Sequence, residues 1–335
     1  MTPTPLMRAV VITRPGGPEV LEVQQRPVPA PADHEVLIRV FASALNRADL
    51  LQRQGQYPAP PGAPADIPGM EFAGEVARLG GAVTGWKEGD RVFGIVGGGA
   101  NADYLVTDAG TLARVPDRLS WTDAAAVPEA FITAYDALVT QAAVCAGEAV
   151  LIHAVGSGVG LASVQMACAW KATPYGTART PSKIERARGF GLADGVVVGD
   201  DVAVVIAAAD RWTSGKGIDV TLDLVGGAYV AAEIQAAAKR GRIMLIGTVA
   251  GRSATIPVGM VLGKRLTLRG TVLRARSLEE KREVTAAFAR DVVPLFESGT
   301  LGPTVDRVLP LVEIGAAHER LASNATFGKV VLDHG

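Results

Sequence analysis

The sequence predicts an α/β protein made of two domains, and three observations lead to this prediction. A chain of 335 residues is longer than one hydrophobic core usually serves. Its first third contains short alternating segments separated by turn residues, which is typical of antiparallel strands. After residue 148, strand-like and helix-like segments alternate, which is typical of a doubly wound parallel sheet with helices on its faces.

The first part of the chain is expected to form an antiparallel β domain. Arg8–Thr13 alternates and is followed by a Pro-Gly-Gly-Pro turn, and Glu35–Phe41 is a second strand candidate. Short strands continue over residues 86–116, so we expect a partly open barrel. The tail, Val305–Asp333, returns to a strand–helix–strand pattern and is expected to pack back on this domain.

The second part of the chain is expected to begin with helices and continue with a parallel sheet. Ser120 has the features of a helix N-cap, with the acidic Asp123 three residues later. An alanine-rich helical region then runs toward Ala143 and is interrupted at Pro128. The strand expected over 265–273 is the sixth and would lie at the edge of the sheet. The predicted strands are 149–152, 173–177, 195–198, 218–224, 242–247 and 265–273, and the predicted helices include 182–189, 202–213, 228–239 and 277–298.

Composition argues against several classes of protein. A net charge of −1 does not predict a nucleic-acid or membrane-surface partner. The two cysteines, Cys145 and Cys168, are too few for a disulfide framework, and their apolar neighbours predict buried thiols. The N-terminal residues lack the apolar region of a signal peptide, and no apolar segment is long enough to span a bilayer. We therefore expect a cytoplasmic protein.

The stretch from Glu148 to Trp170 has the order of a dinucleotide-binding βαβ unit. A short apolar strand is followed by a turn with glycines at 156, 158 and 160, and then by a helical pattern. Glycines allow the backbone to approach a pyrophosphate, and the start of the helix supplies free N–H groups. The spacing is G-x-G-x-G rather than G-x-G-x-x-G, so a tight turn without a ligand is the alternative interpretation.

The end of the next strand indicates which dinucleotide is bound. NAD-binding units carry an acidic residue about 20 residues after the glycine turn, where it meets the ribose hydroxyl. This chain has no Asp or Glu there and instead offers Thr177, Arg179 and Lys183. Because basic side chains bind a 2′-phosphate, the segment predicts NADPH as the cofactor. The alternative is that Arg179 and Lys183 form a solvated face at the start of a helix.

Several motifs spread along the chain resemble one family. The chain is similar to the zinc-free NAD(P)H quinone oxidoreductases of the medium-chain dehydrogenase/reductase superfamily, in the branch of the p53-inducible quinone oxidoreductase. The resemblance implies a GroES-like catalytic domain over residues 1–125 and 272–335 and a Rossmann domain over 126–271. It also implies a homodimer that pairs through the edge strand near 265–273. The motifs lie at Ala42–Leu50, Arg53–Pro58, Pro68–Glu75, Ala125–Glu129, His153–Gly160 and Phe327–Leu332.

The chain departs from the zinc enzymes of this superfamily at the metal positions. Those enzymes have a Cys near the place of Asn46 and a Gly-His-Glu motif where this chain has Gly69-Met70-Glu71. Because neither Asn46 nor Met70 is a zinc ligand, we expect no metal site. A further departure is Val198, where related reductases often carry a Tyr against the 2′-phosphate. Its absence weakens the expectation of a strict preference for NADPH, although Arg179 can compensate.

Without zinc, the reaction lacks a Lewis acid, so the acceptor must itself be electrophilic. A quinone or a conjugated carbonyl, reduced by hydride from NADPH in a cleft between the domains, meets this requirement. By resemblance, Asn46 and Tyr57 are expected to line the substrate pocket, with Asp49 as a third catalytic candidate. Tyr57 packed on a proline-rich loop and Asn46 as a helix cap are the structural alternatives.

The expected cofactor residues come from the glycine turn, from the basic segment after it and, for Leu273, Arg274 and Lys329, from the same resemblance. A further residue, Glu129, is expected only to join the domains structurally, and His153 is expected to be a buried histidine held by backbone groups. The expected cofactor-binding residues are Ser157, Gly158, Val159, Gly160, Thr177, Arg179, Lys183, Gly247, Thr248, Leu273, Arg274 and Lys329.

Two other functions remain open at this point. An NADPH-dependent ene-reductase that acts on enones or enoyl thioesters uses the same fold, but it needs a proton donor to carbon, for which Tyr57 is the candidate. An NADPH-binding protein with little turnover is the other possibility. The near-neutral charge and the absence of a basic, aromatic-rich segment argue against an RNA-binding role for such a protein.

Overall fold

A computed structural model describes residues 5–335 of the chain. The chain divides into two compact units. Unit 1 comprises the described residues up to Ile132 together with Leu273–Gly335, and unit 2 comprises Thr133–Val272. The mixed α/β fold class is confirmed, with an antiparallel-rich sheet in unit 1 and a parallel sheet in unit 2. No helix in the described range is long and apolar enough to cross a membrane.

Unit 1 is built on a seven-stranded sheet and a separate two-stranded sheet. In the larger sheet the order is β14-β15-β3-β4-β5-β7, and β6 also pairs with β3. Most of its pairs are antiparallel, and only β14 and β15 run parallel. The strands are β1 (Leu6–Ile12), β2 (Leu21–Pro27), β3 (Glu35–Ala44), β4 (Glu71–Leu79), β5 (Arg91–Ile95), β6 (Tyr104–Asp108), β7 (Leu112–Arg114), β14 (Val305–Pro310) and β15 (Lys329–Asp333).

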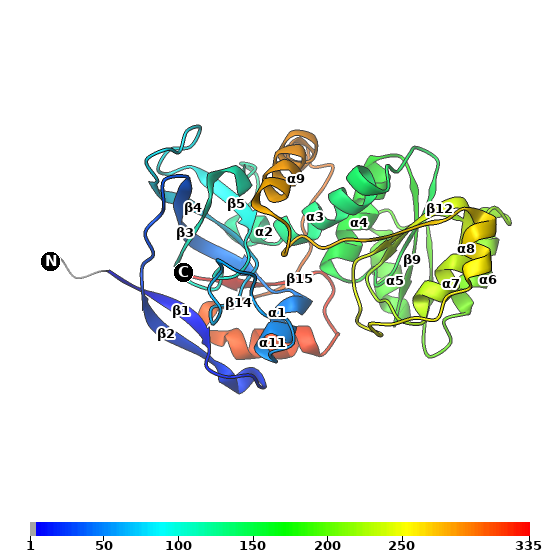
Figure 1. Cartoon of the computed structure of the whole chain (residues 1–335), viewed down its shortest axis with the longest axis horizontal. Coiled ribbons are helices and arrows are strands. Elements are labelled where there is room, and N and C mark those ends of the chain that lie inside the picture. Colours follow the sequence, from blue (N-terminus) through cyan, green and yellow to red (C-terminus); the bar gives the residue numbers. More distant parts are fainter. Residues whose placement is uncertain (1–4) are drawn as a thin grey trace. The chain divides into compact units, whose positions relative to one another are not determined.

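The helices of unit 1 come from both ends of the chain. Figure 1 shows α11, from the C-terminal tail, beside α1, which follows β3. The tail therefore packs on the N-terminal part as expected, because β15 pairs with β3. The helices are α1 (Arg47–Arg53), α2 (Trp121–Ala125), α3 (Pro128–Tyr135, which crosses the unit boundary), α9 (Leu278–Asp291), α10 (Val293–Glu297) and α11 (Ile314–Ala322), with short 3-10 turns η1 (Pro18–Val20), η2 (Ala109–Thr111) and η4 (Leu311–Glu313).

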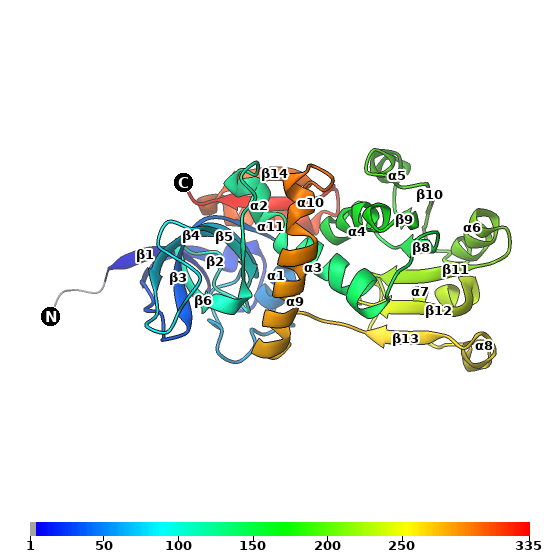
Figure 2. The ribbon, with the colours of Figure 1, turned by 90° about the horizontal axis from the view of Figure 1, so that it is seen from above.

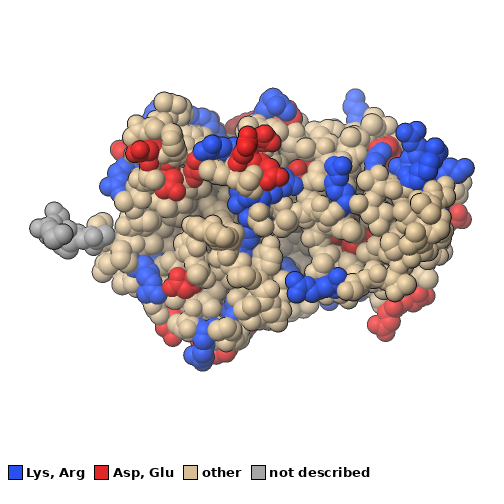
Figure 3. Space-filling model, viewed as in Figure 1, with Lys and Arg blue, Asp and Glu red and all other residues tan. Residues whose placement is uncertain are grey.

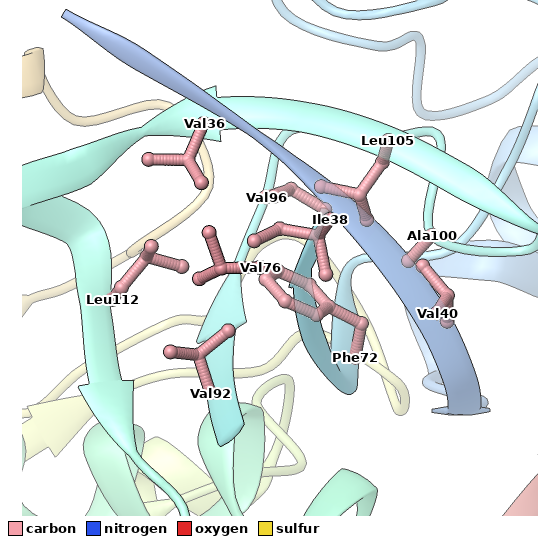
Figure 4. Close-up of a cluster of buried hydrophobic side chains, with 10 residues drawn as sticks. All are labelled: Val36, Ile38, Val40, Phe72, Val76, Val92, Val96, Ala100, Leu105 and Leu112. Carbon is pink, nitrogen blue, oxygen red and sulfur yellow. The ribbon is translucent and has the colours of Figure 1, made fainter. Parts of the chain in front are cut away.

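The core of unit 1 follows from the period of its strands. Val36, Ile38 and Val40 alternate along β3, so their side chains point to the same face of the sheet. Figure 4 shows these three side chains gathered with those of Phe72 and Val92 from the neighbouring strands. This packing holds β3 and β4 rigidly, and the residues just beyond their ends form the candidate site. On the visible face of unit 1, acidic and basic side chains are interspersed (Figure 3).

Unit 2 is a six-stranded sheet in the order β10-β9-β8-β11-β12-β13, and every neighbouring pair is parallel. In Figure 2 the strands run between α4 on one side and α6 on the other. The elements are β8 (Ala149–Ile152), β9 (Thr173–Ala178), β10 (Asp194–Val197), β11 (Ile218–Asp223), β12 (Ala237–Leu245), β13 (Thr267–Gly270), α4 (Gly158–Ala169), α5 (Pro181–Arg188), α6 (Val204–Thr213), α7 (Tyr229–Ala236), α8 (Val258–Lys264) and a π-helical turn η3 (Asp136–Gln141).

Several expected boundaries differ in the structure. The helix expected over 228–239 ends at Ala236, because β12 already begins at Ala237. The edge strand expected over 265–273 is shorter, and Arg265 instead caps α8 with a left-handed backbone. The helix expected over 277–298 divides at Val292, since Pro294 has no N–H to continue the hydrogen-bond ladder.

The prediction of buried cysteine thiols was wrong. Both Cys145 and Cys168 are exposed. Cys145 lies in the loop before β8, and Cys168 lies on the outer side of α4, although Met166 and Ala167 beside it in sequence are fully buried. Consecutive residues of a helix point to different sides, so apolar neighbours in sequence do not establish burial.

Candidate functional site

Three adjacent strands bring polar residues to one end of the sheet in unit 1. Asn46 follows the end of β3, Glu71 begins β4 and Lys329 begins β15. In the register of the sheet, Ser43 pairs with Phe72 and Ala44 pairs with Val331. Because β15, β3 and β4 are neighbours, this register places the three polar residues together. Asn46 and Lys329, which are far apart in sequence, therefore meet at the same point.

Lys329 and Glu71 form a buried ion pair, and Asn46 is hydrogen-bonded to both of them. The ammonium of Lys329 lies 2.6 Å from Glu71 Oε1 and donates to Asn46 Oδ1 (2.6 Å) and to the carbonyl of Leu45 (2.9 Å). The amide Nδ2 of Asn46 donates to Glu71 Oε1 at 2.8 Å. Glu71 is fully buried, and Lys329 is 5% exposed. All three ammonium hydrogens have an acceptor, so within unit 1 Lys329 is committed to this cluster rather than extended for a phosphate.

Asp49 is buried in the first turn of α1, next to this cluster. Its two carboxylate oxygens accept from the backbone N–H groups of Asn46 (2.7 Å) and Gly69 (3.1 Å). Burial raises the pKa of Asp49 to about 6, and these two hydrogen bonds and the charge of Lys329 limit the rise. Asn46 occupies the N-cap position of α1, so its capping role and its place in the polar cluster exist together. Asp49 holds the turn that presents Asn46.

Glu129 also belongs to this cluster, although the sequence suggested only a linking role for it. It follows Pro128 at the start of α3, and its backbone N–H donates to Glu71 Oε2 at 2.8 Å. Its own Oε2 is buried without a hydrogen-bond partner. Burial, followed by the charge of Glu71, raises the pKa of Glu129 to about 7. A helix N-terminus favours the ionised form by only about 0.3–1 kcal/mol, which does not offset the several kcal/mol that burial of a charge costs.

Tyr57 is held by Arg274, a residue that the sequence assigned to the cofactor side. The guanidinium carbon of Arg274 lies 5.0 Å from the centroid of the Tyr57 ring, which is a cation–π contact. Arg274 is 3% exposed, and it donates to the carbonyl of Gly97 (2.8 Å) and to Gln52 Oε1 (2.6 Å). Burial raises the pKa of Tyr57. Its neighbour Leu273 is buried. The loop tyrosine therefore stacks on a fixed cation.

Unit 2 presents its glycine turn where the strand order reverses. The chain proceeds from β8 to β9 and β10 on one side, and then returns to β11 on the other side of β8. A crevice at such a switch point, at the carboxyl ends of the strands, is where α/β sheets bind nucleotides. Ser157 caps α4 by accepting from the N–H of Gly160 at 3.0 Å. With Gly158 and Val159 it begins the helix whose free N–H groups suit a pyrophosphate.

The third glycine of the turn is required for close packing. A Cβ on Gly160 would lie 2.4 Å from the carbonyl oxygen of Ala154 and 2.8 Å from Cα of Val155. Both contacts are with backbone, which cannot rotate away. Gly160 therefore lets α4 start directly against the end of β8, so that the turn keeps its shape.

We expect Gly160→Ala to lower the free energy of unfolding by about 1–3 kcal/mol, the usual cost of overpacking. Alanine in place of glycine normally stabilises a helix by about 0.5–1 kcal/mol, so the sign of the change is the informative result. Chemical denaturation measures it. Gly259→Ala in α8, where an added Cβ meets nothing within 4 Å, is the matched control and should not destabilise. Equal stability of the two variants would contradict the packing argument.

The residues expected at the adenosine end lie close to this turn but differ in accessibility. The Lys183 stem covers Gly156, because an added Cβ on that glycine would come within 2.7 Å of Lys183 Cδ. Arg179 is exposed just after β9 and acts electrostatically on Tyr229. Thr177 is 2% exposed, and its hydroxyl pairs with His153 Nδ1 at 2.9 Å. Lys183 thus lies against the glycine turn, Arg179 is exposed just after β9, and the Thr177 hydroxyl already has a partner.

Gly247 and Thr248 follow β12 at the same edge of the sheet. The N–H of Gly247 donates to the carbonyl of Asp223 at 3.0 Å, and a Cβ on Gly247 would lie 2.3 Å from the carbonyl oxygen of Leu224. Thr248 is exposed. The cofactor candidates of unit 2 therefore lie near the carboxyl ends of the parallel strands of the sheet.

His153, Asp223 and Glu233 form a buried cluster of titratable side chains in unit 2. The sequence indicated only His153 as a buried residue. His153 Nε2 lies 3.0 Å from Glu233 Oε1, without hydrogen-bond geometry, and both side chains are fully buried. Asp223 accepts from the N–H groups of Val225 and Gly226 through one oxygen, at 2.7 Å each. His153 thus has side-chain neighbours rather than the expected backbone partners. Nothing in the sequence pattern of α7 distinguished Glu233 from a solvated residue.

Burial sets the protonation of this cluster. It raises the pKa of Glu233 to about 8 and that of Asp223 to about 6, and it lowers the pKa of His153 to about 4. Near pH 7, therefore, Glu233 and His153 are both neutral and Asp223 carries the charge. Only one charge remains in the buried cluster.

We expect the stability of the protein to fall between about pH 7 and pH 8. Glu233 binds a proton in the folded state up to about pH 8, but its ordinary pKa of 4.5 means that the unfolded chain has already released it. Unfolding then releases a proton, and the free energy of unfolding falls by at most about 1.4 kcal/mol per pH unit. His153 acts in the opposite sense only below its ordinary pKa of 6.5. Denaturation at several pH values should show a slope that Glu233→Gln reduces, the remainder coming from Glu129, whose pKa is about 7. An undiminished slope would contradict the assignment.

Comparison with known proteins places the two units in named families. The model of the alcohol dehydrogenase GroES-like domain matches residues 32–117, and the model of the zinc-binding dehydrogenase matches residues 158–290. No group of three or more His, Cys, Asp or Glu residues within 5–335 is arranged to hold a metal ion. The fold, the glycine turn and these matches together define an oxidoreductase that binds a pyridine nucleotide.

Full-length relatives narrow this class. A quinone oxidoreductase from Lama guanicoe is 33% identical over 98% of this chain and 97% of its own. The mycobacterial protein Rv1454c, solved in complex with NADPH, and a quinone oxidoreductase from Pseudomonas syringae pv. Tomato DC3000 are each 28% identical, with a TM-score of 0.86 over 98% of this chain and 99% of theirs. The chain belongs to the quinone oxidoreductase family of the medium-chain dehydrogenase/reductase superfamily. The family resemblance is thereby confirmed, and the roles of individual site residues stay predictions.

Proposed function

We propose that the protein is an NADPH-dependent, zinc-independent reductase that transfers a hydride from the nicotinamide to a quinone. The observation that carries the proposal is the Lys329–Glu71–Asn46 cluster. Two of the positions that bind zinc in the metal-dependent enzymes of this superfamily hold Asn46 and Met70. The adjoining carboxylate, Glu71, has the Lys329 ammonium at 2.6 Å. This donor set does not fit a zinc ion, because an ammonium already neutralises the one anionic ligand.

The residues of unit 2 fit an NADPH molecule. The N–H groups at the start of α4, capped by Ser157, are suited to the pyrophosphate, and Arg179 and Lys183 are suited to the 2′-phosphate. The bound nicotinamide would supply the hydride. The named NADPH complex of Rv1454c supports a dinucleotide of this kind. Leu273 and Arg274 remain candidates for the nicotinamide side of the cofactor, whereas the ammonium of Lys329 is already held by Glu71, Asn46 and the carbonyl of Leu45.

Tyr57 is our candidate for the hydrogen-bond donor to the quinone oxygen. Arg274 beneath its ring fixes the loop residue, and Tyr57 itself is only partly buried, so its hydroxyl is available to a substrate. The Asn46 side chain already has partners within unit 1. Its Nδ2 donates to Glu71 Oε1 (2.8 Å) and to the carbonyl of Ala44 (3.5 Å), and its Oδ1 accepts from Lys329 (2.6 Å). Asp49 acts indirectly by holding the first turn of α1.

NADPH oxidation with panels of benzoquinones, naphthoquinones and enones tests the function. We expect turnover with quinones, since they are electrophilic without a metal. Tyr57→Phe should lower quinone turnover without abolishing it, because only a hydrogen bond to the quinone oxygen is lost. Enone reduction, which needs a proton delivered to carbon, should be abolished. Turnover with enones alone would identify an ene-reductase. No oxidation with any acceptor would favour an NADPH-binding protein with little turnover.

We also propose that two copies pair through the edge of the unit 2 sheet. β13 lies at the end of the strand order, so one side of its backbone has no strand partner among residues 5–335. The adjoining α8 has no buried residue, and Val258 and Leu262 are 56% and 72% exposed. An unpaired strand edge beside apolar side chains is suited to a second copy. Sedimentation equilibrium would show the mass of a dimer. The cytoplasmic location remains a prediction from sequence.

A further inference from the structure

The polar cluster of unit 1 contains one more acidic group than basic groups. Asp49, Glu71 and Glu129 lie within electrostatic reach of one another, together with Lys329 and Arg274. Three carboxylates and two cations would leave one negative charge inside the protein. Because an uncompensated buried charge is costly, one proton on one of the carboxyl groups makes the cluster neutral.

The hydrogen bonds indicate which carboxyl group takes that proton. Oε1 of Glu71 lies 2.6 Å from the Lys329 ammonium and accepts a hydrogen bond from Asn46, and Oε2 accepts from the backbone N–H of Glu129. Both oxygens of Asp49 accept from backbone N–H groups. The buried Oε2 of Glu129 has no hydrogen-bond partner, and no cation pairs with this carboxyl group among the described residues. Both oxygens of Glu71 and of Asp49 thus accept from donors, and Glu129 is the group left to be neutral.

We propose that the carboxyl group of Glu129 is the proton donor to the reduced acceptor, a role that rests on the proposed quinone reductase function. Hydride transfer brings two electrons and one proton to the quinone and leaves a hydroquinone monoanion. The O–H bond of Glu129 then breaks, and a new O–H bond forms on the hydroquinone oxygen. The Glu129 carboxylate regains its proton from water, so that the cycle balances.

Two further observations suit Glu129 to this role. Glu129 has intermediate exposure as a residue, although its Oε2 is buried. It also acts electrostatically on Tyr57, the candidate donor to the quinone oxygen, so the two groups are neighbours. The groups that face Glu129 are Glu71 and Asp49, which favour its protonated form, and Lys329 and Arg274, which oppose it. Their balance keeps both forms populated near neutral pH, as a general acid requires.

Glu129→Gln separates proton donation from structure. The hydrogen bond that Glu129 gives to Glu71 comes from its backbone N–H, so the substitution retains it. With the full-length protein, NADPH and benzoquinone, we expect kcat at pH 7 to fall by about 10²–10⁴-fold and the pH dependence of kcat near pH 7 to disappear. The dissociation constant of NADPH, measured by fluorescence, should not change. Glu88→Gln on the exposed surface is the matched control and should leave all three measurements unchanged.

A measurement without turnover distinguishes failure of this proposal from failure of the proposed function. Difference infrared spectroscopy across pH 7 should show loss of protonated carboxyl absorption in the wild-type protein. The loss should be smaller in Glu129→Gln, where only Glu233, Asp223 and Asp49 still contribute. Wild-type turnover with quinones together with an unaffected Glu129→Gln variant, or an infrared change of undiminished size in that variant, would overturn the role of Glu129. Absence of wild-type turnover with quinones would overturn the proposed function and the donor role with it, even if the infrared band behaves as expected.

Discussion

Lys329→Met is expected to lower the free energy of unfolding by about 3–5 kcal/mol, because it leaves a buried charge without its partner. Glu71 is fully buried, and its Oε1 would lose the ammonium at 2.6 Å. Asn46 Oδ1 and the carbonyl of Leu45 would lose a donor at the same time. Methionine keeps most of the volume of the lysine stem, so the change reports on the charge rather than on a cavity. Urea denaturation of the full-length protein measures the effect.

Two other variants make this result specific. Lys216→Met removes an ion pair of similar length, 2.8 Å, but Lys216 is 62% exposed. Surface pairs contribute about 0–1 kcal/mol, so this control should change little. The double variant Lys329→Met/Glu71→Gln removes both charges and should recover part of the lost stability. If Lys329→Met costs no more than Lys216→Met, the buried ion pair does not stabilise unit 1.

The double variant Arg179→Ala/Lys183→Ala should weaken NADPH binding far more than NADH binding. Each charge-assisted hydrogen bond to the 2′-phosphate is worth about 1.5–3 kcal/mol, which corresponds to roughly 10- to 150-fold in the dissociation constant. NADH lacks that phosphate, so its binding should change little. Lys183 lies over Gly156 of the glycine turn, and Arg179 is exposed at the end of β9. Fluorescence titration with each dinucleotide measures the ratio.

Arg188→Ala is the matched control for this measurement. Arg188 lies in the same helix as Lys183, but its guanidinium pairs with Asp194 at 2.7 Å. Its removal should affect both dinucleotides equally. Equal losses of NADPH and NADH affinity in the Arg179→Ala/Lys183→Ala protein would show that these side chains do not bind the 2′-phosphate. They would then be a solvated face at the start of α5.

Local patterns predicted the elements of the fold well. The apolar run 149–152 is β8, Ser120 caps α2 by accepting from the N–H of Asp123, and Pro128 begins a new helix as the interruption indicated. Such features depend on neighbours within a few residues, which is the range over which sequence patterns are informative. Errors concentrate where a left-handed residue or a new strand ends an element early, as at Arg265 and Ala237.

The candidate site was predicted only in part, because its contacts join distant segments. The Asn46–Lys329 hydrogen bond spans 283 positions, and the Arg274–Gln52 hydrogen bond spans 222. No local period records such a pairing. Glu129 and Glu233 therefore read as ordinary acidic residues of helices, although burial places both among other titratable groups.

The sequence by itself determined the α/β class and the strand–glycine turn–helix unit, because these follow from residue types and short spacings. Only the tertiary structure decided which charges are buried and what neutralises them. Sheet register brought Lys329 to Glu71 and left Glu129 without a cation. The electrostatic state of a side chain depends on distance through space and on exclusion of water, and neither quantity is encoded in the local order of residues.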